Sequence, residues 1–293
     1  MTARPEPSEA VPPSRGGHAL QFGFSTLGCP DLDPAGVRTL AVAHRFRFVE
    51  IRTLAGSLNF PEKLAGFPGG ALGVRDFFLQ ADVRVPLVAS SFLLTRSAEA
   101  ERTALIAEAE AGEALGARWL RVFGGGEWGD PLTPERAATA SAHRRWWTGI
   151  RAERGWAIDL ILETHDAFSG TPEIRDFFGQ TGGPMPLLWD THHTWKVARE
   201  AVADTWAWLG AHVRHVHMKD SISVSWDRLP YAYTAPGRGE FPTTATLDLL
   251  VEARFTGLIS LEWEKQWHPS LPPLDQILPA WKAVTVPFRP FED

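Results

Sequence analysis

Short apolar runs alternate with helix-like segments along almost the whole chain. Eight such runs are present: ALQFGFST (19–26), FRFVEIR (46–52), VRVPLVASS (83–91), ARWLRVFG (117–124), AIDLILE (157–163), PLLWD (186–190), VRHVHMK (213–219) and LISLEWE (258–264). An apolar run of about four to eight residues between turn signals is typical of a strand that is buried on both faces. The alternation therefore predicts repeated strand–helix units and a parallel sheet covered by helices.

The segments between these runs carry helix signals. Asp33, Thr133 and Thr171 each precede a proline, the arrangement of a capping side chain followed by a first-turn residue. Gly116 follows the third predicted helix, where a left-handed cap is favoured. The predicted helices cover residues 34–44, 74–81, 98–115, 134–154, 172–178, 197–209, 244–253 and 274–283.

Eight strand–helix units within 293 residues match the (β/α)8 TIM barrel, whose typical length is about 250 residues. An open doubly wound sheet would normally carry a glycine-rich phosphate-binding turn after its first strand. Here the first strand continues into STLGCPDLD, and the glycine cluster at 124–126 follows the fourth strand. We therefore expect an α/β protein with one TIM-barrel catalytic domain over residues 18–293, preceded by a flexible, disordered tail over residues 1–17.

The tail and the composition indicate where the protein works. Residues 1–17 are rich in Pro, Ser and Glu and contain no apolar segment of the kind found in a secretory signal. The single cysteine, Cys29, excludes an internal disulfide and fits a reducing compartment. No apolar stretch approaches the roughly 20 residues that span a bilayer. The net charge is −6, and Lys and Arg are dispersed rather than clustered as in a nucleic-acid-binding surface. These features predict a soluble cytoplasmic protein without a membrane or nucleic-acid partner.

Four successive strand candidates end in side chains that bind hard divalent cations: Glu163, Asp190, His217 and Glu262. In a barrel the carboxyl ends of all strands meet on one face, so these residues would share one pocket. Each residue alone is more often a cap, a loop hydrogen-bond acceptor or a core residue, but the repetition on four strands indicates a metal site. Three carboxylates and one imidazole favour Mn²⁺, Mg²⁺ or Co²⁺ in six-coordinate geometry, with Zn²⁺ as a further option.

Several short motifs follow the predicted strands in a set order: FSTLGCP, FVEIR, LRVFGG, LETHD, LWDTHH, HVHMKD and SLEWEK. Together they extend over most of the chain and resemble the xylose-isomerase-like TIM-barrel superfamily, and within it the sugar phosphate isomerases and epimerases. The resemblance implies that Glu163, Asp190, His217 and Glu262 are the metal ligands. It favours His217 over His215 because His217 precedes the Asp of HVHMKD by three positions.

The resemblance also implies a reaction. In such isomerases and epimerases a divalent metal holds two adjacent oxygens of a ketose or hydroxyketone and stabilises the enediolate that forms when a proton leaves the carbon beside the carbonyl. Glu163 and Glu262 flank the expected metal and are the predicted catalytic pair, one removing a proton and the other returning one. The predicted partner is a small sugar, sugar phosphate or polyol-derived substrate of carbohydrate metabolism.

Three further residues are predicted to bind the substrate or to position the site. His193 matches the family's inward histidine, which contacts a substrate hydroxyl. His165 follows Glu163 closely and either orients its carboxylate or caps the loop. Lys219 shares its side of the strand with His217 and either binds an acidic group of the substrate or lies solvated at the rim.

Glu50 and Arg238 complete the predicted substrate-binding set. Glu50 resembles the family's inward acid, which contacts substrate or an inner arginine, and the alternative is an ion pair with Arg52 or Arg121. Arg238 lies in the long segment SISVSWDRLPYAYTAPGRGEFP, which follows the seventh predicted strand. Long loops in compact domains are usually functional or mobile, so Arg238 either closes on an oxyanion of the substrate or lies exposed in a turn.

Three other functions remain open at this stage. A metal-dependent dehydratase would begin with the same proton abstraction and expel a β-hydroxyl. An abasic-site endonuclease shares the barrel but uses several zinc ions and more ligands, and the acidic net charge does not favour it. A non-catalytic sugar-binding barrel would have no need to hold three carboxylates together against their repulsion. Whether the chain forms a homo-oligomer also stays open.

Overall fold

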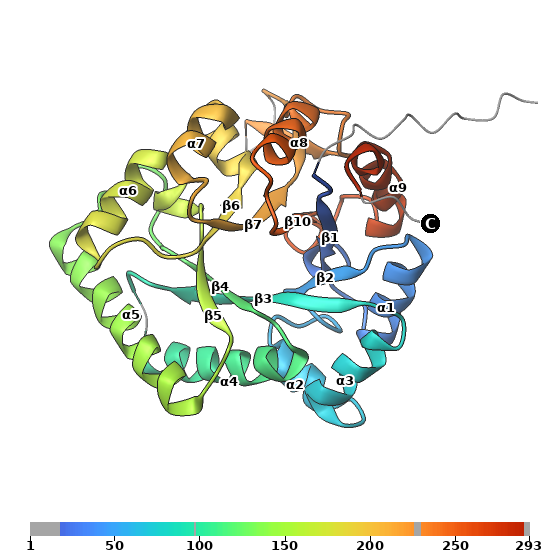
Figure 1. Ribbon diagram of the computed structural model, residues 1–293, viewed down its shortest axis with the longest axis horizontal. Helices are drawn as coiled ribbons and strands as arrows, with labels where there is room; N and C mark the ends of the chain where they lie inside the picture. Colours follow the sequence, from blue (N-terminus) through green and yellow to red (C-terminus); the bar gives the residue numbers. More distant parts are fainter. Residues whose placement is uncertain (1–17, 97, 226–229, 290–293) are drawn as a thin grey trace, which may run out of the picture.

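Eight parallel strands close into a barrel at the centre of the molecule (Figure 1). The computed structural model describes residues 18–96, 98–225 and 230–289, so the predicted tail at residues 1–17 lies outside the described part of the chain. The strands are β1 (Gln21–Ser25), β2 (Phe48–Ile51), β3 (Arg84–Leu93), β4 (Trp119–Phe123), β5 (Asp159–Glu163), β6 (Leu187–Asp190), β7 (Val213–Met218) and β10 (Leu258–Leu261). They follow one another around the barrel in chain order, and β10 closes it against β1. The predicted (β/α)8 fold is confirmed.

Helices surround this barrel on its outer side (Figure 1). Two of the three predicted caps form: Asp33 Oδ1 accepts a hydrogen bond from the Gly36 N–H at 2.8 Å, and the Thr133 hydroxyl accepts one from the Arg136 N–H at 3.4 Å. Gly116 adopts the left-handed φ of 83° that a helix end favours. The helices are α1 (Pro34–Ala43), α2 (Phe60–Ala65), α3 (Gly70–Leu79), α4 (Glu99–Leu115), α5 (Pro134–Arg154), α6 (Thr171–Gln180), α7 (Val202–Leu209), α8 (Thr243–Glu252) and α9 (Leu274–Thr285), with short helical turns η1 (Thr26–Gly28), η2 (Asp166–Phe168), η3 (His193–Val197) and η4 (Val286–Phe288).

The structure corrects the third predicted cap and one helix boundary. Thr171 is the first residue of α6 rather than its cap, and both its N–H and its hydroxyl donate to the Glu200 carboxylate. The helix predicted from residue 197 begins at Val202 instead. The preceding residues form the π-helical turn η3, and Arg199, at φ 60°, interrupts the helical backbone between the two elements.

Two hydrophobic cores hold the barrel together. The larger core lies between the barrel and its helices and includes the fully buried indoles of Trp189 and Trp281. The smaller core lies inside the barrel and consists of side chains that alternate with outward-facing residues along their strands: Leu87, Ala89, Ile161 and Leu188, with Trp119 packed against them. This inner core closes the barrel's interior below the ends of the strands, so any site must lie above it.

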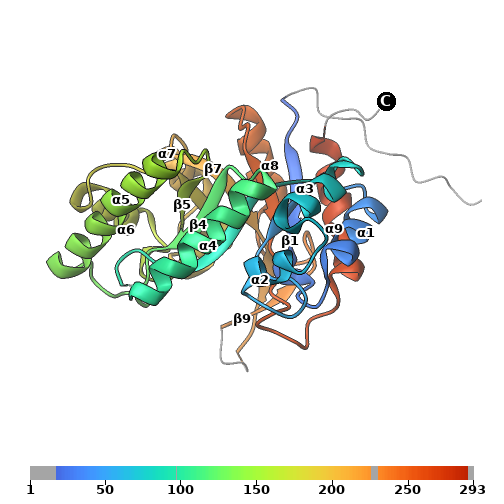
Figure 2. The same cartoon turned by 90° about the horizontal axis from the view of Figure 1, so that it is seen from below.

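The segment after β7, predicted as one long loop, contains an antiparallel hairpin of β8 (Asp220–Ser223) and β9 (Tyr231–Thr234). Strand β9 projects at the lower edge of the molecule in Figure 2. The rest of the segment is held by the Asp220 carboxylate, which accepts hydrogen bonds from the backbone N–H groups of Gly237, Gly239 and Phe241 at 2.9–3.0 Å.

No helix in the described residues is long and apolar enough to cross a membrane.

Candidate metal centre

The four predicted ligands meet at the carboxyl ends of the last four barrel strands. Glu163 and Asp190 are the last residues of β5 and β6, His217 is one residue from the end of β7, and Glu262 directly follows β10. Because side chains alternate along a strand, Glu163 and Asp190 share their inward direction with the inner-core residues two positions earlier, Ile161 and Leu188. One ligand atom from each side chain lies within 4.8 Å of all the others, and all four residues are buried.

The ligand atoms that face one another have the spacing and chemistry to coordinate one cation. His217 Nδ1 lies 3.5 Å from Glu163 Oε1 and 3.4 Å from Glu262 Oε1. His217 Nδ1, Glu163 Oε2 and Asp190 Oδ2 are buried and have no hydrogen-bond partner. Glu163 Oε2 and Asp190 Oδ2 have ion-pair contacts only, with Arg121 at 3.2 Å and with Lys219 at 2.8 Å. A hard dication coordinated by oxygen and imidazole donors would satisfy atoms of this kind. The cluster therefore has the donor set for one divalent ion.

A second contact orients each of the four side chains. His217 Nε2 lies 2.6 Å from Glu50 Oε2. Asp190 Oδ1 accepts hydrogen bonds from the backbone N–H groups of His192 and His193 at 2.9 and 3.0 Å. Glu163 Oε2 lies 3.2 Å from Arg121 Nε, and Glu262 Oε2 accepts a hydrogen bond from Lys219 Nζ at 2.5 Å. Partners of this kind fix the orientation of metal ligands and tune their basicity.

Lys219 is buried among the ligands, which excludes the solvated rim position that the sequence left open. Its ammonium lies 2.8 Å from Asp190 Oδ2, 2.5 Å from Glu262 Oε2 and 2.6 Å from Glu264 Oε1. Burial opposes its charge, but these three carboxylates outweigh burial and raise the pKa of Lys219 well above its usual value. Lys219 is therefore a fixed positive charge beside the ligands.

Glu50 contacts histidines rather than the arginines considered in the sequence analysis. Its carboxylate is fully buried, accepts the Ser25 hydroxyl at 3.0 Å and lies 2.6 Å from His217 Nε2 and 3.3 Å from His215 Nε2. Burial would raise the pKa of Glu50, but the two imidazoles outweigh burial and lower it. An ionised Glu50 holds the Nε2 proton of His217, so that Nδ1 is left to face the other ligands.

Both carboxylates of the predicted catalytic pair are ionised in this environment. Burial would raise the pKa of Glu262, but His217 and Lys219 outweigh it and hold the pKa well below its usual value. Burial would likewise raise the pKa of Glu163, and Arg121 and His217 lower it despite the repulsion from Glu262. Each carboxylate is therefore in the deprotonated form that metal coordination requires.

A cavity of about 290 Å³ opens above the ligands and includes both predicted catalytic carboxylates in its wall. Its volume is near the lower end of the range for small-molecule sites, and the half-exposed Trp267 stands at its edge. The described residues that line it are Leu27, Arg52, Ser91, Leu93, Arg121, Phe123, Glu163, His165, Asp166, Glu262, Glu264 and Trp267.

Of the predicted substrate-binding residues, only His165 lines this cavity; Glu50, Lys219, His193 and Arg238 lie outside its lining. His193 is buried beside it: its Nδ1 lies 3.4 Å from Asp190 Oδ2, and its ring meets the His165 ring edge-on at 4.5 Å between centroids. Arg238 is exposed on the loop held by Asp220. His165, by contrast, does line the cavity, with its Nδ1 2.6 Å from Asp166 Oδ1.

Arg52 and Arg121 were not predicted as site residues, although both line the cavity. The alternation of inward and outward side chains along each strand could have identified them. Arg52 lies two positions after Glu50, and Arg121 lies two positions after Trp119, which packs against the inner core. Each arginine therefore faces inward like those residues.

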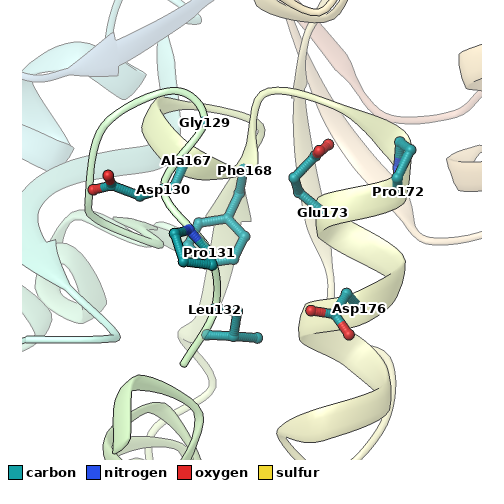
Figure 3. Close-up of a pocket in the computed structure, with 9 residues that line it drawn as sticks. All are labelled: Gly129, Asp130, Pro131, Leu132, Ala167, Phe168, Pro172, Glu173 and Asp176. Carbon is teal, nitrogen blue, oxygen red and sulfur yellow. The ribbon is translucent and has the colours of Figure 1, made fainter. Parts of the chain in front are cut away.

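A separate cavity of about 340 Å³ lies away from the metal ligands, between the loop after β4 and helix α6 (Figure 3). The loop Gly129–Leu132 faces Glu173 and Asp176 of α6 across it, with Phe168 between them. None of the predicted ligands or substrate-binding residues lines this cavity, so the barrel mouth remains the candidate site.

The fold and the site define a class: a (β/α)8 barrel with a carboxylate–histidine cluster at the carboxyl ends of its last four strands. The chain belongs to the xylose isomerase-like TIM barrel family, whose sequence model matches residues 40–282. The resemblance inferred from the motifs is thereby confirmed. No curated protein sequence matches the chain significantly.

Solved structures with the same fold share little sequence with this chain. The probable 3-DHS dehydratase AsbF of Bacillus anthracis has a TM-score of 0.72 at 15% identity, with 91% of this chain and 97% of that chain covered. The IOLI protein with a bound zinc atom has a TM-score of 0.70 at 16% identity, with the same coverage. A D-allulose 3-epimerase from Methylomonas sp. has a TM-score of 0.64 at 17% identity, with 92% and 96% covered. At these identities the likeness establishes the fold and not the reaction.

Proposed function

We propose that the protein is a divalent-metal-dependent isomerase or epimerase of a small sugar, sugar phosphate or polyol-derived ketone. The single observation that carries this proposal is the placement of two ionised carboxylates, Glu163 and Glu262, beside one imidazole and in the wall of one small cavity. Glu163, Asp190, His217 and Glu262 would hold the cation. When bound, a divalent cation supplies Lewis acidity to a carbonyl oxygen and its neighbouring hydroxyl.

The residues of this chain would then move the proton. Glu163 and Glu262 come from β5 and from the end of β10, and these strands are separated by β6 and β7 around the barrel. They approach the cavity from different sides, so one can take a proton from the carbon beside the carbonyl and the other can return a proton to the opposite face. Arg121 and Lys219 hold their outer oxygens and so fix both carboxylates in position.

A dehydratase is the second candidate. One of the structural neighbours is described as a probable dehydratase and another as an epimerase, and both reactions begin by removing a proton beside a carbonyl. A dehydratase then loses a β-hydroxyl as water, whereas an epimerase returns a proton to carbon. Mass spectrometry of the products distinguishes the two, since only dehydration lowers the mass of the substrate by one water.

The proposal is tested by proton–deuterium exchange into a panel of ketoses in D₂O, with Mn²⁺ present. We expect exchange at the carbon beside the carbonyl of at least one ketose. Glu163→Gln and Glu262→Gln should each lower its rate by at least about 100-fold, the loss typical of a missing general base. Glu127→Gln, at an exposed position, is the matched control and should keep the wild-type rate. Near-normal exchange in both catalytic variants would refute the assigned roles.

A further inference from the structure

Two buried guanidinium groups line the cavity, and neither moves a proton in the proposed reaction. Arg52, directly after β2, and Arg121, in β4, are 5% and 2% exposed, and both line the cavity that contains Glu163 and Glu262. Burying one charged side chain is costly unless it is paired. Two guanidinium groups in the wall of one small cavity therefore call for a specific explanation.

Arg121 has hydrogen-bond donors to spare. Its Nε and Nη1 are buried without a hydrogen-bond partner, and its closest anion is Glu163 Oε2, 3.2 Å from Nε. The Phe123 ring covers one face of the guanidinium, with 3.8 Å from the central carbon to the ring centroid. A guanidinium carries five N–H donors in a planar fork. Arg121 itself lines the cavity.

Arg52 is held in place beside it. Arg52 Nη2 donates to the Ser91 hydroxyl at 2.7 Å, and Nη1 donates to the Ala89 carbonyl at 3.3 Å. Burial and the nearby positive charge of Arg121 lower the pKa of Arg52 to about 10, so it is still charged at neutral pH. The two like charges repel each other.

Carboxylates also lie near the two arginines, but most of them have other partners or carry only part of a charge. Burial raises the pKa of Glu108, which interacts with both arginines, to about 7. Glu262 and Glu264, which line the same cavity, are both paired with Lys219, as is Asp190. Among the described residues, Glu163 alone forms an ion pair with either cavity arginine. An oxyanion between the two guanidinium groups would relieve their repulsion and satisfy the spare donors of Arg121.

We propose that Arg52 and Arg121 form a subsite for an anionic group of the substrate, a carboxylate or a phosphate monoester. This proposal deepens the proposed function, because the anionic group belongs to the molecule whose carbonyl faces the metal ligands. Arginine forks bind both kinds of oxyanion through paired N–H donors. The cavity of about 290 Å³ limits the substrate to a small molecule, so the substrate class is a small acidic hydroxyketone rather than a neutral ketose.

Three matched ligands test this subsite: D-fructose, D-fructose 6-phosphate and D-fructuronate, which differ only at the terminal carbon. Calorimetry with the Mn²⁺-reconstituted protein gives the dissociation constant of each. We expect at least one anionic ligand to bind 10-fold or more tightly than fructose, and the comparison of the two shows which oxyanion the site prefers. This comparison needs no variant. Equal affinity for all three ligands would overturn the proposal.

Two variants then locate the effect. Arg52→Met should remove the preference for the anionic ligand and leave the affinity for fructose within about twofold of wild type. Arg84→Met is the matched control, because Arg84 is exposed at the amino-terminal end of β3, and it should keep the wild-type preference. Retention of the preference in Arg52→Met, or its equal loss in Arg84→Met, would overturn the assignment.

The outcome separates this inference from the proposed function. Proton exchange into neutral ketoses without any preference for anions would overturn the subsite and leave the isomerase or epimerase assignment standing. Tight binding of an anionic ligand that depends on Arg52, without exchange of its protons, would support the subsite and contradict the proposed reaction.

Discussion

Lys219 makes three ion pairs in a space that water barely reaches, since its side chain is 1% exposed. We expect Lys219→Met to lower the free energy of unfolding by about 3–5 kcal/mol, because the buried carboxylates lose their counter-charge. A divalent cation restores positive charge to the same carboxylates, so the loss should be smaller in Mn²⁺ than in EDTA. Urea unfolding in the two buffers measures both values, with Lys63→Met as the surface control. Equal losses in both buffers would contradict this account of the site.

Glu50, although predicted to bind substrate, does not line the cavity and instead contacts His217, so its effect should pass through His217. We expect Glu50→Gln to weaken Mn²⁺ binding about 10- to 100-fold, the usual cost of losing the carboxylate behind a ligating histidine. Calorimetric titration of the chelator-treated protein with Mn²⁺ measures the change. Unaltered affinity would mean that Glu50 does not orient His217.

The Cys29 thiol should resist both ionisation and alkylation in the folded protein. Burial, together with the nearby Asp31 carboxylate, raises the pKa of the Cys29 thiol to about 12. The folded protein therefore keeps the thiol protonated as the pH rises past its ordinary value near 9, and stability contributed by this group falls only above that pH. We expect iodoacetamide to leave Cys29 unmodified at pH 8.5 in the native protein and to label it fully in guanidinium chloride. Mass spectrometry reads out both states, and rapid native labelling would show an accessible thiolate.

At the scale of secondary structure, Asp220 joins the two ends of the segment after β7. Its two oxygens accept four backbone N–H groups, those of Ser221, Gly237, Gly239 and Phe241. Asp220→Asn should destabilise the protein by about 1–3 kcal/mol, because an amide nitrogen replaces one buried acceptor. It should also speed cleavage within residues 221–242 in limited proteolysis. An unchanged cleavage rate would show that other contacts hold the loop.

The barrel elements could be predicted because their pattern is local. Each strand is a short apolar run, and Asp33 and Thr133 cap helices through bonds to residues three positions away. Helix α2 and the β8–β9 hairpin were missed. They are too short to show a full period of the hydrophobic pattern, and the hairpin lies in a polar stretch where turn residues dominate. The helix predicted from residue 197 begins five residues later, because the positive φ of Arg199 interrupts the helical backbone between η3 and α7.

At the scale of the whole molecule, the site depends on barrel closure. The ligand positions could be predicted, since a parallel barrel brings every strand's carboxyl end to one face. Their partners could not, because contacts such as Glu50 with His217 join residues 167 positions apart and depend on barrel closure and rotamers. The same reason explains why Lys219 was not recognised as an internal counter-charge. Arg52 and Arg121 stayed unassigned because inward direction alone does not separate a core residue from a site residue.

Anomalous diffraction at the manganese edge, from crystals grown with Mn²⁺, tests the metal site directly. We expect one strong peak about 2.0–2.6 Å from single ligand atoms of Glu163, Asp190, His217 and Glu262. Bound manganese found elsewhere, or no peak at the barrel mouth at saturating Mn²⁺, would contradict it.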